Sequence, residues 1–304
     1  MSENVVTIGT FDGVHLGHRA ILDRVDSEAT RLNARRLAYV FELPPRMTLE
    51  ANRPPRLLLP LDVRLKLLRQ FVDRVELARF GEVRALSPDA FASDIIAGEL
   101  DARSVVVGAG FRFGRDRSGD LAVLTAAGKA FGFDVQAVEA LRIDGEPVSS
   151  TRIRSLLSAG DVSEATAMLG RPPILVGRGI RREDVERQIE YPTFGLELNS
   201  NVLVPANGVY AVRAFVGTEA IDGLLHVGAG ATLAGNKSRC EVQLLSSPDI
   251  DLDGCALEAH IVGRLRNSCA AASLDARKEQ IHRDAAQAAD VLANLPDCEG
   301  PIGG

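Results

Sequence analysis

Two histidines near the start of the chain stand where side chains and backbone could bind a phosphate group together. His15 and His18 lie in the segment GTFDGVHLGH at residues 9–18, between an apolar run at residues 5–8 and an amphipathic pattern from Ile21 onward. A strand, a glycine turn and a helix start would direct free backbone N–H groups and the positive end of the helix dipole at one point. This order of residues predicts a phosphate site.

The spacing of the two histidines indicates what they could do there. His15 and His18 are three residues apart, so both reach the same bound group if the helix begins near Leu16. Cationic or hydrogen-bond-donating imidazoles beside a phosphate suit a reaction that expels pyrophosphate. A zinc site would need a third ligand and usually a glutamate base, and the chain has no HExxH or Cys–His cluster. Ordinary surface histidines are the other alternative, although two of only 5 histidines fall in this loop.

The segments that must position this loop alternate between strand-like and helix-like patterns. Buried strands are predicted at residues 5–8, 37–41, 75–77, 105–107 and 135–138, with helical patterns between them. Such alternation is typical of a parallel sheet, whose ligands bind beyond the carboxyl ends of the strands. The loops at residues 9–18 and 108–114 both leave from those ends. We therefore expect them to line one pocket.

The pattern changes after this region. A helix is predicted from Ser149 or Ser150 to Leu157, and an Asp-x-x-Glu start formed by Asp161 and Glu164 predicts a second one. The segment Gly170-Arg171-Pro172-Pro173 predicts a domain boundary, with one domain at residues 1–172 and another at residues 173–304. Between residues 174 and 266, short β-rich runs predict a small antiparallel barrel, and a helix is predicted at residues 274–295. The runs lie at residues 174–176, 196–198, 209–216, 241–245 and 257–262.

Composition narrows the class of protein. A net charge of −6 over 304 residues argues against a nucleic-acid binder, and no apolar run is long enough to span a membrane. The 4 cysteines form no CxxC pair, which suits reduced thiols. We expect a cytoplasmic protein whose partners are small molecules. The sequence leaves open whether the chain forms a homo-oligomer.

Residues 9–18 resemble the first nucleotide motif of the HxGH nucleotidyltransferases. Their sequence is similar to that of the same motif in the prokaryotic FAD synthetase family (bifunctional riboflavin kinase/FMN adenylyltransferases). Three further segments resemble that family in order and spacing. They are the glycine loop VVVGAGFRFG at residues 105–114, the phosphate motif SSTRIR at residues 149–154 and the segment FELPP at residues 41–45. The resemblance implies a Rossmann-like α/β nucleotidyltransferase domain followed by a riboflavin-kinase-like β-barrel with a C-terminal helix.

The resemblance also implies an activity, which is transfer of AMP from ATP to FMN with Mg²⁺, and a set of site residues. His15, His18 and Arg154 match the catalytic positions. The matches to the ATP-binding positions are Gly9, Phe11, Asp12, Gly13, Gly17, Gly108, Ser150 and Thr151. The matches to the flavin-binding positions are Phe41, Phe111, Arg112 and Phe113. Two roles stay open for Asp12, which either lies near Mg²⁺ or holds the turn.

The first domain departs from the family pattern at two places. Leu43 and Pro44 stand where the family has a Pro-His pair, and Gly110 stands where it usually has Asp or Asn. Both places belong to loops near the acceptor or the triphosphate. An altered acceptor, such as another flavin-like phosphate, therefore stays open beside FMN.

The second domain departs more strongly. Thr193 and Glu241 match kinase positions, and Glu241 matches the general base. Gly195 replaces an asparagine of the phosphate site, while Arg182, Glu186 and Glu190 replace glycines of the ATP flap. Side chains obstruct the close approach of backbone N–H groups to phosphate. The sequence thus predicts a barrel without kinase activity. The alternatives are a two-activity enzyme and a non-catalytic flavin-binding protein.

Overall fold

The computed structural model describes residues 4–43, 56–182, 191–229, 238–246, 253–268, 273–293 and 300–302. The chain forms two compact units. The first comprises Met1–Pro55 and Leu61–Ser149, and the second comprises Arg56–Pro60 and Ser150–Gly304. The domain boundary placed after residue 172 from the sequence stays a prediction. Among the described residues, no helix combines the length and the apolar character that crossing a membrane would require.

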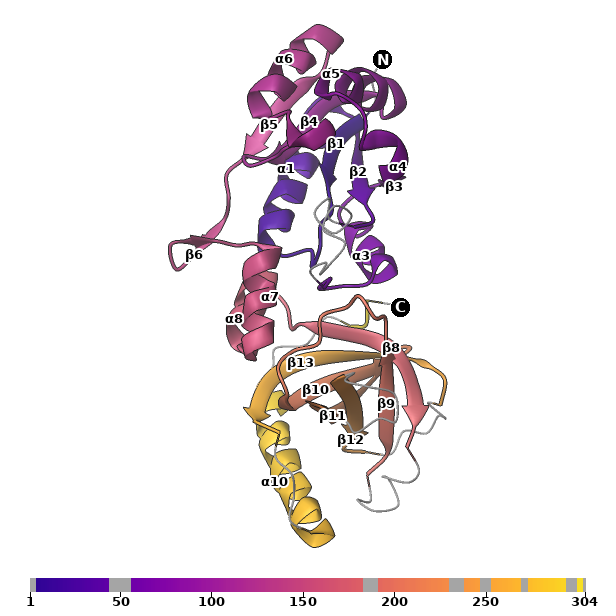
Figure 1. Cartoon of the computed structure of the whole chain (residues 1–304), viewed down its shortest axis with the longest axis vertical. Coiled ribbons are helices and arrows are strands. Elements are labelled where there is room, and N and C mark those ends of the chain that lie inside the picture. The colour runs from indigo at the N-terminus through magenta and orange to yellow at the C-terminus, as the bar shows by residue number, and fades with distance from the viewer. Residues whose placement is uncertain are drawn as a thin grey trace. The chain divides into compact units, whose positions relative to one another are not determined.

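The first unit is built on a five-stranded parallel sheet in the order β3-β2-β1-β4-β5 (Figure 1). This confirms the predicted α/β fold and all five predicted strands. Their bounds are β1 (Asn4–Gly9), β2 (Arg35–Phe41), β3 (Arg74–Ala78), β4 (Ala102–Gly108) and β5 (Asp134–Val138). Since β1 lies between β2 and β4, the loops that follow these three strands leave from one edge of the sheet.

Helices cover both faces of this sheet. Its helical segments are α1 (Leu16–Leu32), α3 (Leu61–Leu68), α4 (Phe80–Val83), α5 (Pro88–Ala90), the π-helical η1 (Phe91–Glu99), the 3₁₀-helical η2 (Arg115–Arg117) and α6 (Leu121–Phe131). Alternate strand residues face opposite sides. Val5 packs with Val25 of α1, whereas Val6 packs in the cluster that contains Ile96 of η1 and Leu124 of α6. A short hairpin, β6 (Arg142–Ile143) and β7 (Glu146–Pro147), completes the unit.

The second unit contains a closed antiparallel barrel in the order β10-β11-β12-β9-β8-β13, which confirms the predicted barrel. Its elements are α7 (Ser150–Ala159), α8 (Val162–Leu169), β8 (Ile174–Arg181), β9 (Thr193–Leu198), β10 (Gly208–Val216), β11 (Glu219–Ala229), β12 (Ser238–Leu244), β13 (Ala256–Arg266) and α10 (Leu274–Ala293). The terminal helix packs its apolar face, including Ile281 and Ala288, against Val209 and Leu224 of the barrel.

The β-rich runs predicted from the sequence leave out one strand of the barrel, β11. The second predicted helix is confirmed as α8, with Asp161 as its N-cap residue, but the Asp161 side chain makes no capping hydrogen bond. Its backbone, at φ −83° and ψ 71°, lacks the extended conformation from which a capping side chain reaches back to the helix.

Candidate active site

The two histidines of residues 9–18 lie together at the start of α1. His15 is the N-cap residue, and its Nδ1 accepts a hydrogen bond from the backbone N–H of His18 at 3.3 Å. The two imidazole rings stack with centroids 3.6 Å apart and an interplanar angle of 15°. The ring of Phe11 meets His18 edge-on at 5.3 Å. The spacing of the histidines therefore does place them on one side of the helix start.

The loop that carries them has an unusual backbone. Phe11, Gly13 and Val14 all have positive φ, at 54°, 84° and 41°. This region suits glycine but strains a β-branched residue such as valine. Strain of this kind concentrates at functional sites, where the surrounding structure holds it in place. Asp12, between these residues, is only 2% exposed.

Two glycines of the motif have a steric explanation. A Cβ at position 17 would lie 3.2 Å from the His15 ring and 3.4 Å from the carbonyl oxygen of Val148. A Cβ at position 9 would lie 3.2 Å from the ring of Phe11. These glycines therefore leave the His15 and Phe11 rings room in their observed positions.

The electrostatic setting favours a neutral second histidine. Burial lowers the pKa of His18 well below its ordinary value, and the neighbouring His15 and Arg64 lower it further. In the described part of the chain, the buried Nδ1 of His18 has no hydrogen-bond partner. An uncharged imidazole offers one N–H donor and one acceptor, so it can donate a hydrogen bond to a phosphate oxygen while it carries no net charge.

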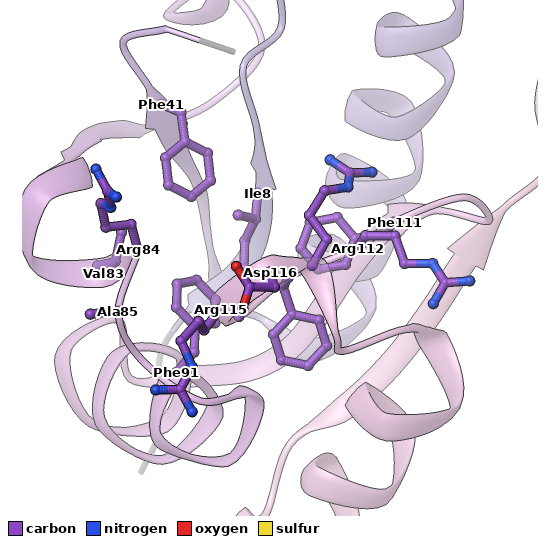
Figure 2. Close-up of a pocket in the computed structure, with 13 residues that line it drawn as sticks. Ile8, Phe41, Val83, Arg84, Ala85, Phe91, Phe111, Arg112, Arg115 and Asp116 are labelled. Atoms are coloured by element: carbon purple, nitrogen blue, oxygen red, sulfur yellow. The ribbon is translucent and has the colours of Figure 1, made fainter. Parts of the chain in front are cut away.

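The four residues that resemble flavin-binding positions line one cavity of about 270 Å³ (Figure 2). Phe41 is the last residue of β2, Phe111, Arg112 and Phe113 follow β4, and Ile8 of β1 also lines the cavity. The structure therefore gathers these four residues around one space, and their role in flavin binding stays a prediction. Sequence reasoning missed several further lining residues, which come from the end of α4, the segment after it and the start of η1: Val83, Arg84, Ala85 and Phe91.

Aromatic contacts hold the cavity wall in place. Phe111 stacks on Phe113 with centroids 5.7 Å apart, and Phe113 packs against Phe91 at 5.8 Å. Figure 2 shows the rings of Phe41, Phe91 and Phe111 grouped around the same space, with the guanidinium groups of Arg84 and Arg115 at its periphery. The cavity thus combines an apolar, aromatic interior with a cationic edge.

The other site positions predicted in the first unit differ in their surroundings. A Cβ at Gly108 would be in ordinary contact with Ile21 of α1, at 3.6 Å. A Cβ at Gly110 would meet nothing within 4 Å, so the surrounding structure does not require a glycine there. Arg112 forms an ion pair with Asp120 at 3.5 Å. Leu43 ends a described segment, and Pro44 lies outside the described residues.

Three predicted phosphate-binding residues belong to the second unit. Ser150, Thr151 and Arg154 occupy the first half of α7. Their approach to His15 and His18 stays a prediction.

The kinase-like positions of the barrel form a contact that the sequence did not predict. Glu241 of β12 is largely buried, and its Oε1 lies 3.3 Å from Nη1 of Arg182. The backbone N–H of Arg182 donates to the carbonyl of Thr193, whose side chain is fully buried. A Cβ at Gly195 would lie 3.8 Å from Cδ of Arg182, so the arginine stem passes over this glycine. Glu186 and Glu190 lie outside the described residues.

Within the segments that the structure describes, no three histidine, cysteine, aspartate or glutamate residues gather in a way that could hold a metal ion. Mg²⁺ commonly enters such reactions on the phosphates of the nucleotide, keeping several waters. We therefore treat it as part of the nucleotide substrate.

Comparisons with known proteins cover both units. A family model described as FAD synthetase matches residues 1–152, and one described as riboflavin kinase matches residues 169–292. The chain is 35% identical to the bifunctional riboflavin kinase/FMN adenylyltransferase of Escherichia coli (strain K12), over 92% of this chain and 90% of that protein. The protein of the same description from Pseudomonas fluorescens is 36% identical, over 95% and 93%.

A solved structure is similar along almost the whole chain. It is described as a macrolide-efflux protein from Streptococcus pneumoniae, and it matches with a TM-score of 0.85 and 26% identity, covering 97% of this chain and 96% of that one. This similarity concerns the fold. The relatives found by sequence are described as bifunctional riboflavin kinase/FMN adenylyltransferases and not as efflux proteins. With two family models and relatives of more than 30% identity along nearly its full length, the chain belongs to the family of bifunctional riboflavin kinases/FMN adenylyltransferases.

Proposed function

We propose that the chain is an FMN adenylyltransferase, which joins AMP from MgATP to the phosphate of FMN and releases pyrophosphate. The observation that carries the proposal is the cavity lined by Phe41, Phe111, Arg112 and Phe113, which opens at the edge of the sheet where β1 leads to the two histidines. At about 270 Å³ it is near the lower end of ligand sites, which span about 300–1,000 Å³. It suits the planar flavin ring rather than a whole dinucleotide.

The charges around the cavity support an acceptor that carries a phosphate. Arg84, Arg112, Arg115 and Arg117 line it together with the aromatic residues. Guanidinium groups bind phosphate bidentately, and aromatic faces stack on planar rings. Riboflavin itself carries no phosphate. A cationic edge beside an aromatic interior therefore favours FMN over riboflavin as the molecule bound here.

The reaction requires little covalent chemistry from the protein. A phosphate oxygen of FMN attacks the α-phosphorus of ATP, a new P–O bond forms, and the bond to the bridging oxygen of pyrophosphate breaks. We propose that neutral His18 and its neighbour His15 donate hydrogen bonds to the phosphates as charge moves onto the leaving group. From the family resemblance, Ser150, Thr151 and Arg154 hold the β and γ phosphates.

We further propose that the barrel does not phosphorylate riboflavin. A general base needs a free carboxylate oxygen at the substrate hydroxyl, and in this chain Oε1 of Glu241 faces the Arg182 guanidinium. The arginine also stands where the family has a flap glycine. The contrary candidate is a two-activity enzyme, which the description of both relatives favours.

One experiment tests both statements. The full chain is incubated with ATP, Mg²⁺ and either FMN or riboflavin, and the flavins are separated by chromatography. We expect FAD from FMN, and from riboflavin no more FMN than a Glu241→Ala variant makes. FMN formed well above that variant would refute the inactive barrel, and failure to form FAD would refute adenylyl transfer to FMN.

A matched pair of variants tests the role of the histidines. We expect His18→Ala to abolish most FAD synthesis, because it removes a donor at the phosphate site. His282→Ala changes a histidine on the outside of α10 and should leave the rate unchanged. Equal rates of FAD synthesis in the two variants would refute the proposed role of His18.

A further inference from the structure

Arg64 is a fully buried charge that none of the sequence motifs includes. It lies in the middle of α3, with an exposed fraction of 0%. Its helix neighbours Val63, Leu67 and Leu68 are also buried. Placing a guanidinium among apolar side chains is unfavourable unless its donors are satisfied and its charge is balanced. The contacts of Arg64 therefore need an explanation.

Two backbone carbonyls receive its hydrogen bonds. Nη1 donates to the carbonyl oxygen of Thr10 at 2.8 Å, and Nη2 donates to that of Glu42 at 2.6 Å. Thr10 is the first residue after β1, in the loop that carries His15 and His18. Glu42 is the first residue after β2, next to Phe41 of the aromatic cavity. One planar guanidinium thus ties together the two loops that border the candidate active site.

Two carboxylates act on the charge of Arg64. The acidic groups that act on it are Asp12, which is buried, and Glu42, which is exposed. Its Nε is buried and has no hydrogen-bond partner within the described segments. Arg64 also lowers the pKa of His18, so its positive charge lies near the histidine pair.

We propose that Arg64 is a positioning residue for adenylyl transfer: it fixes the histidine loop against the end of β2, so that His15 and His18 meet the triphosphate in a productive geometry. This inference rests on the proposed function of the same site. Thr10 precedes a loop with three residues at positive φ, which local sequence preference does not favour. A buried side chain that holds the Thr10 carbonyl against the residue after β2 provides the restraint that such a loop needs.

The test compares three variants of the full chain. Arg64→Met keeps the apolar stem and removes both hydrogen bonds. Arg64→Lys keeps the charge and can reach one carbonyl, but it lacks the planar fork. Arg36→Met is the matched control, because Arg36 also bridges elements of this unit, through Asp26 of α1 and Asp73 before β3, but from the amino end of β2.

The first readout is the rate of FAD formation. A misplacement of about 1 Å costs on the order of 100-fold in rate, so we expect kcat to fall about 100-fold in Arg64→Met. We expect Arg64→Lys to recover at least about a tenth of the wild-type kcat. Arg36→Met should lower the denaturation midpoint with kcat unchanged, because it weakens packing away from the site.

The second readout does not depend on activity. With only 5 histidines in the chain, the imidazole signals can be assigned by NMR. In the protein without substrates, we expect Arg64→Met to shift or broaden the imidazole signals of His15 and His18 and to leave the signal of His226 unchanged. Arg64→Lys should shift the same two signals less strongly, and this variant replaces Arg64→Met in the test if the methionine variant fails to fold.

Two results would overturn the proposal. One is unchanged His15 and His18 signals in both Arg64 variants, and the other is an equal loss of kcat in Arg36→Met. If the wild-type chain forms no FAD at all, the proposed function fails, and the imidazole signals still decide whether Arg64 positions the loop.

Discussion

Removing one ring of the aromatic cavity should weaken binding of FMN while leaving that of ATP intact. Phe111 is partly exposed and stacks on Phe113, whereas Phe113 itself is buried in the core of the unit. Phe111→Ala therefore removes a face available to the flavin with limited damage to the fold. The lost contact between Phe111 and Phe113 should lower the free energy of unfolding by about 1 kcal/mol.

The expected size of the effect follows from ring stacking. Stacking of an aromatic base on one aromatic side chain contributes about 1–3 kcal/mol, as judged by alanine substitution. The rings of Phe41, Phe91 and Phe113 remain in the variant, so a value of about 2 kcal/mol is expected for Phe111 alone. Since about 1.4 kcal/mol is a factor of ten, the KM for FMN should rise roughly 25-fold.

Steady-state rates of FAD formation, with FMN and ATP varied in turn, measure this change. The control is Phe131→Ala, which shortens a 42% exposed phenylalanine at the last turn of α6 and should leave both KM values unchanged. A KM for ATP that rises as much as that for FMN would refute the assignment of the cavity to the flavin. So would an unchanged KM for FMN.

Three further changes have outcomes that the structure specifies. Gly17→Ala puts a Cβ 3.2 Å from the His15 ring, so kcat should fall about 10- to 100-fold with little change in the melting temperature; a wild-type rate would mean that the ring can move without consequence. Gly119→Ala puts a Cβ 2.6 Å from the ring of Phe113 and should lower the free energy of unfolding in urea by about 1–3 kcal/mol, whereas Gly110→Ala, which meets nothing within 4 Å, should be neutral. Burial lowers the pKa of His226 from 6.5 to about 4, so the folded barrel binds this proton less readily than the unfolded chain. The free energy of unfolding contributed by the neutral His226 should therefore be fully present above pH 6.5. It should fall by about 2 kcal/mol at pH 4.5, a value reduced for the partial solvent exposure of the ring. Urea titrations of the His226→Gln variant should show a smaller fall between these two pH values.

The elements with strong apolar patterns were predictable from the sequence. The five strands of the sheet are short valine-rich or leucine-rich runs separated by helical patterns, and each lies where it was expected. The convergence of the loops after β1 and β4 followed from the rule that parallel strands end at one edge. The place of Phe41 beside Phe111 came from the family resemblance.

Strand β11 was missed because its sequence contains an Asp-Gly pair, which is typical of turns. In the fold, Asp222 pairs with Arg213 of the neighbouring strand at 2.9 Å. A Cβ at Gly223 would lie 2.8 Å from the carbonyl oxygen of Gln243. The glycine therefore serves the close approach of two strands, which depends on a partner far away in the sequence. The β6–β7 hairpin could have been found, since Asp144-Gly145 is a favourable two-residue turn and both residues have positive φ.

Arg64 could not have been identified from the sequence. An arginine in an amphipathic pattern ordinarily belongs to the solvent-facing side, and the helical pattern between the second and third predicted strands was recognised from its apolar residues alone. Its burial depends on two carbonyls, those of Thr10 and Glu42, which only the tertiary fold brings to one point. The same holds for Arg182 and Glu241, whose contact joins the end of β8 to β12.

The left-handed backbone of Phe11 and Val14 has a consequence for engineering this protein. Each such residue destabilises the fold by about 1–2 kcal/mol relative to glycine at the same place. Val14→Gly would relax the turn, but Val14 is only 1% exposed, and the loss of its buried side chain costs about 1.5–3 kcal/mol. Strain and burial therefore offset each other at this position, so selection for heat resistance should leave the valine, and with it the shape of the turn, in place.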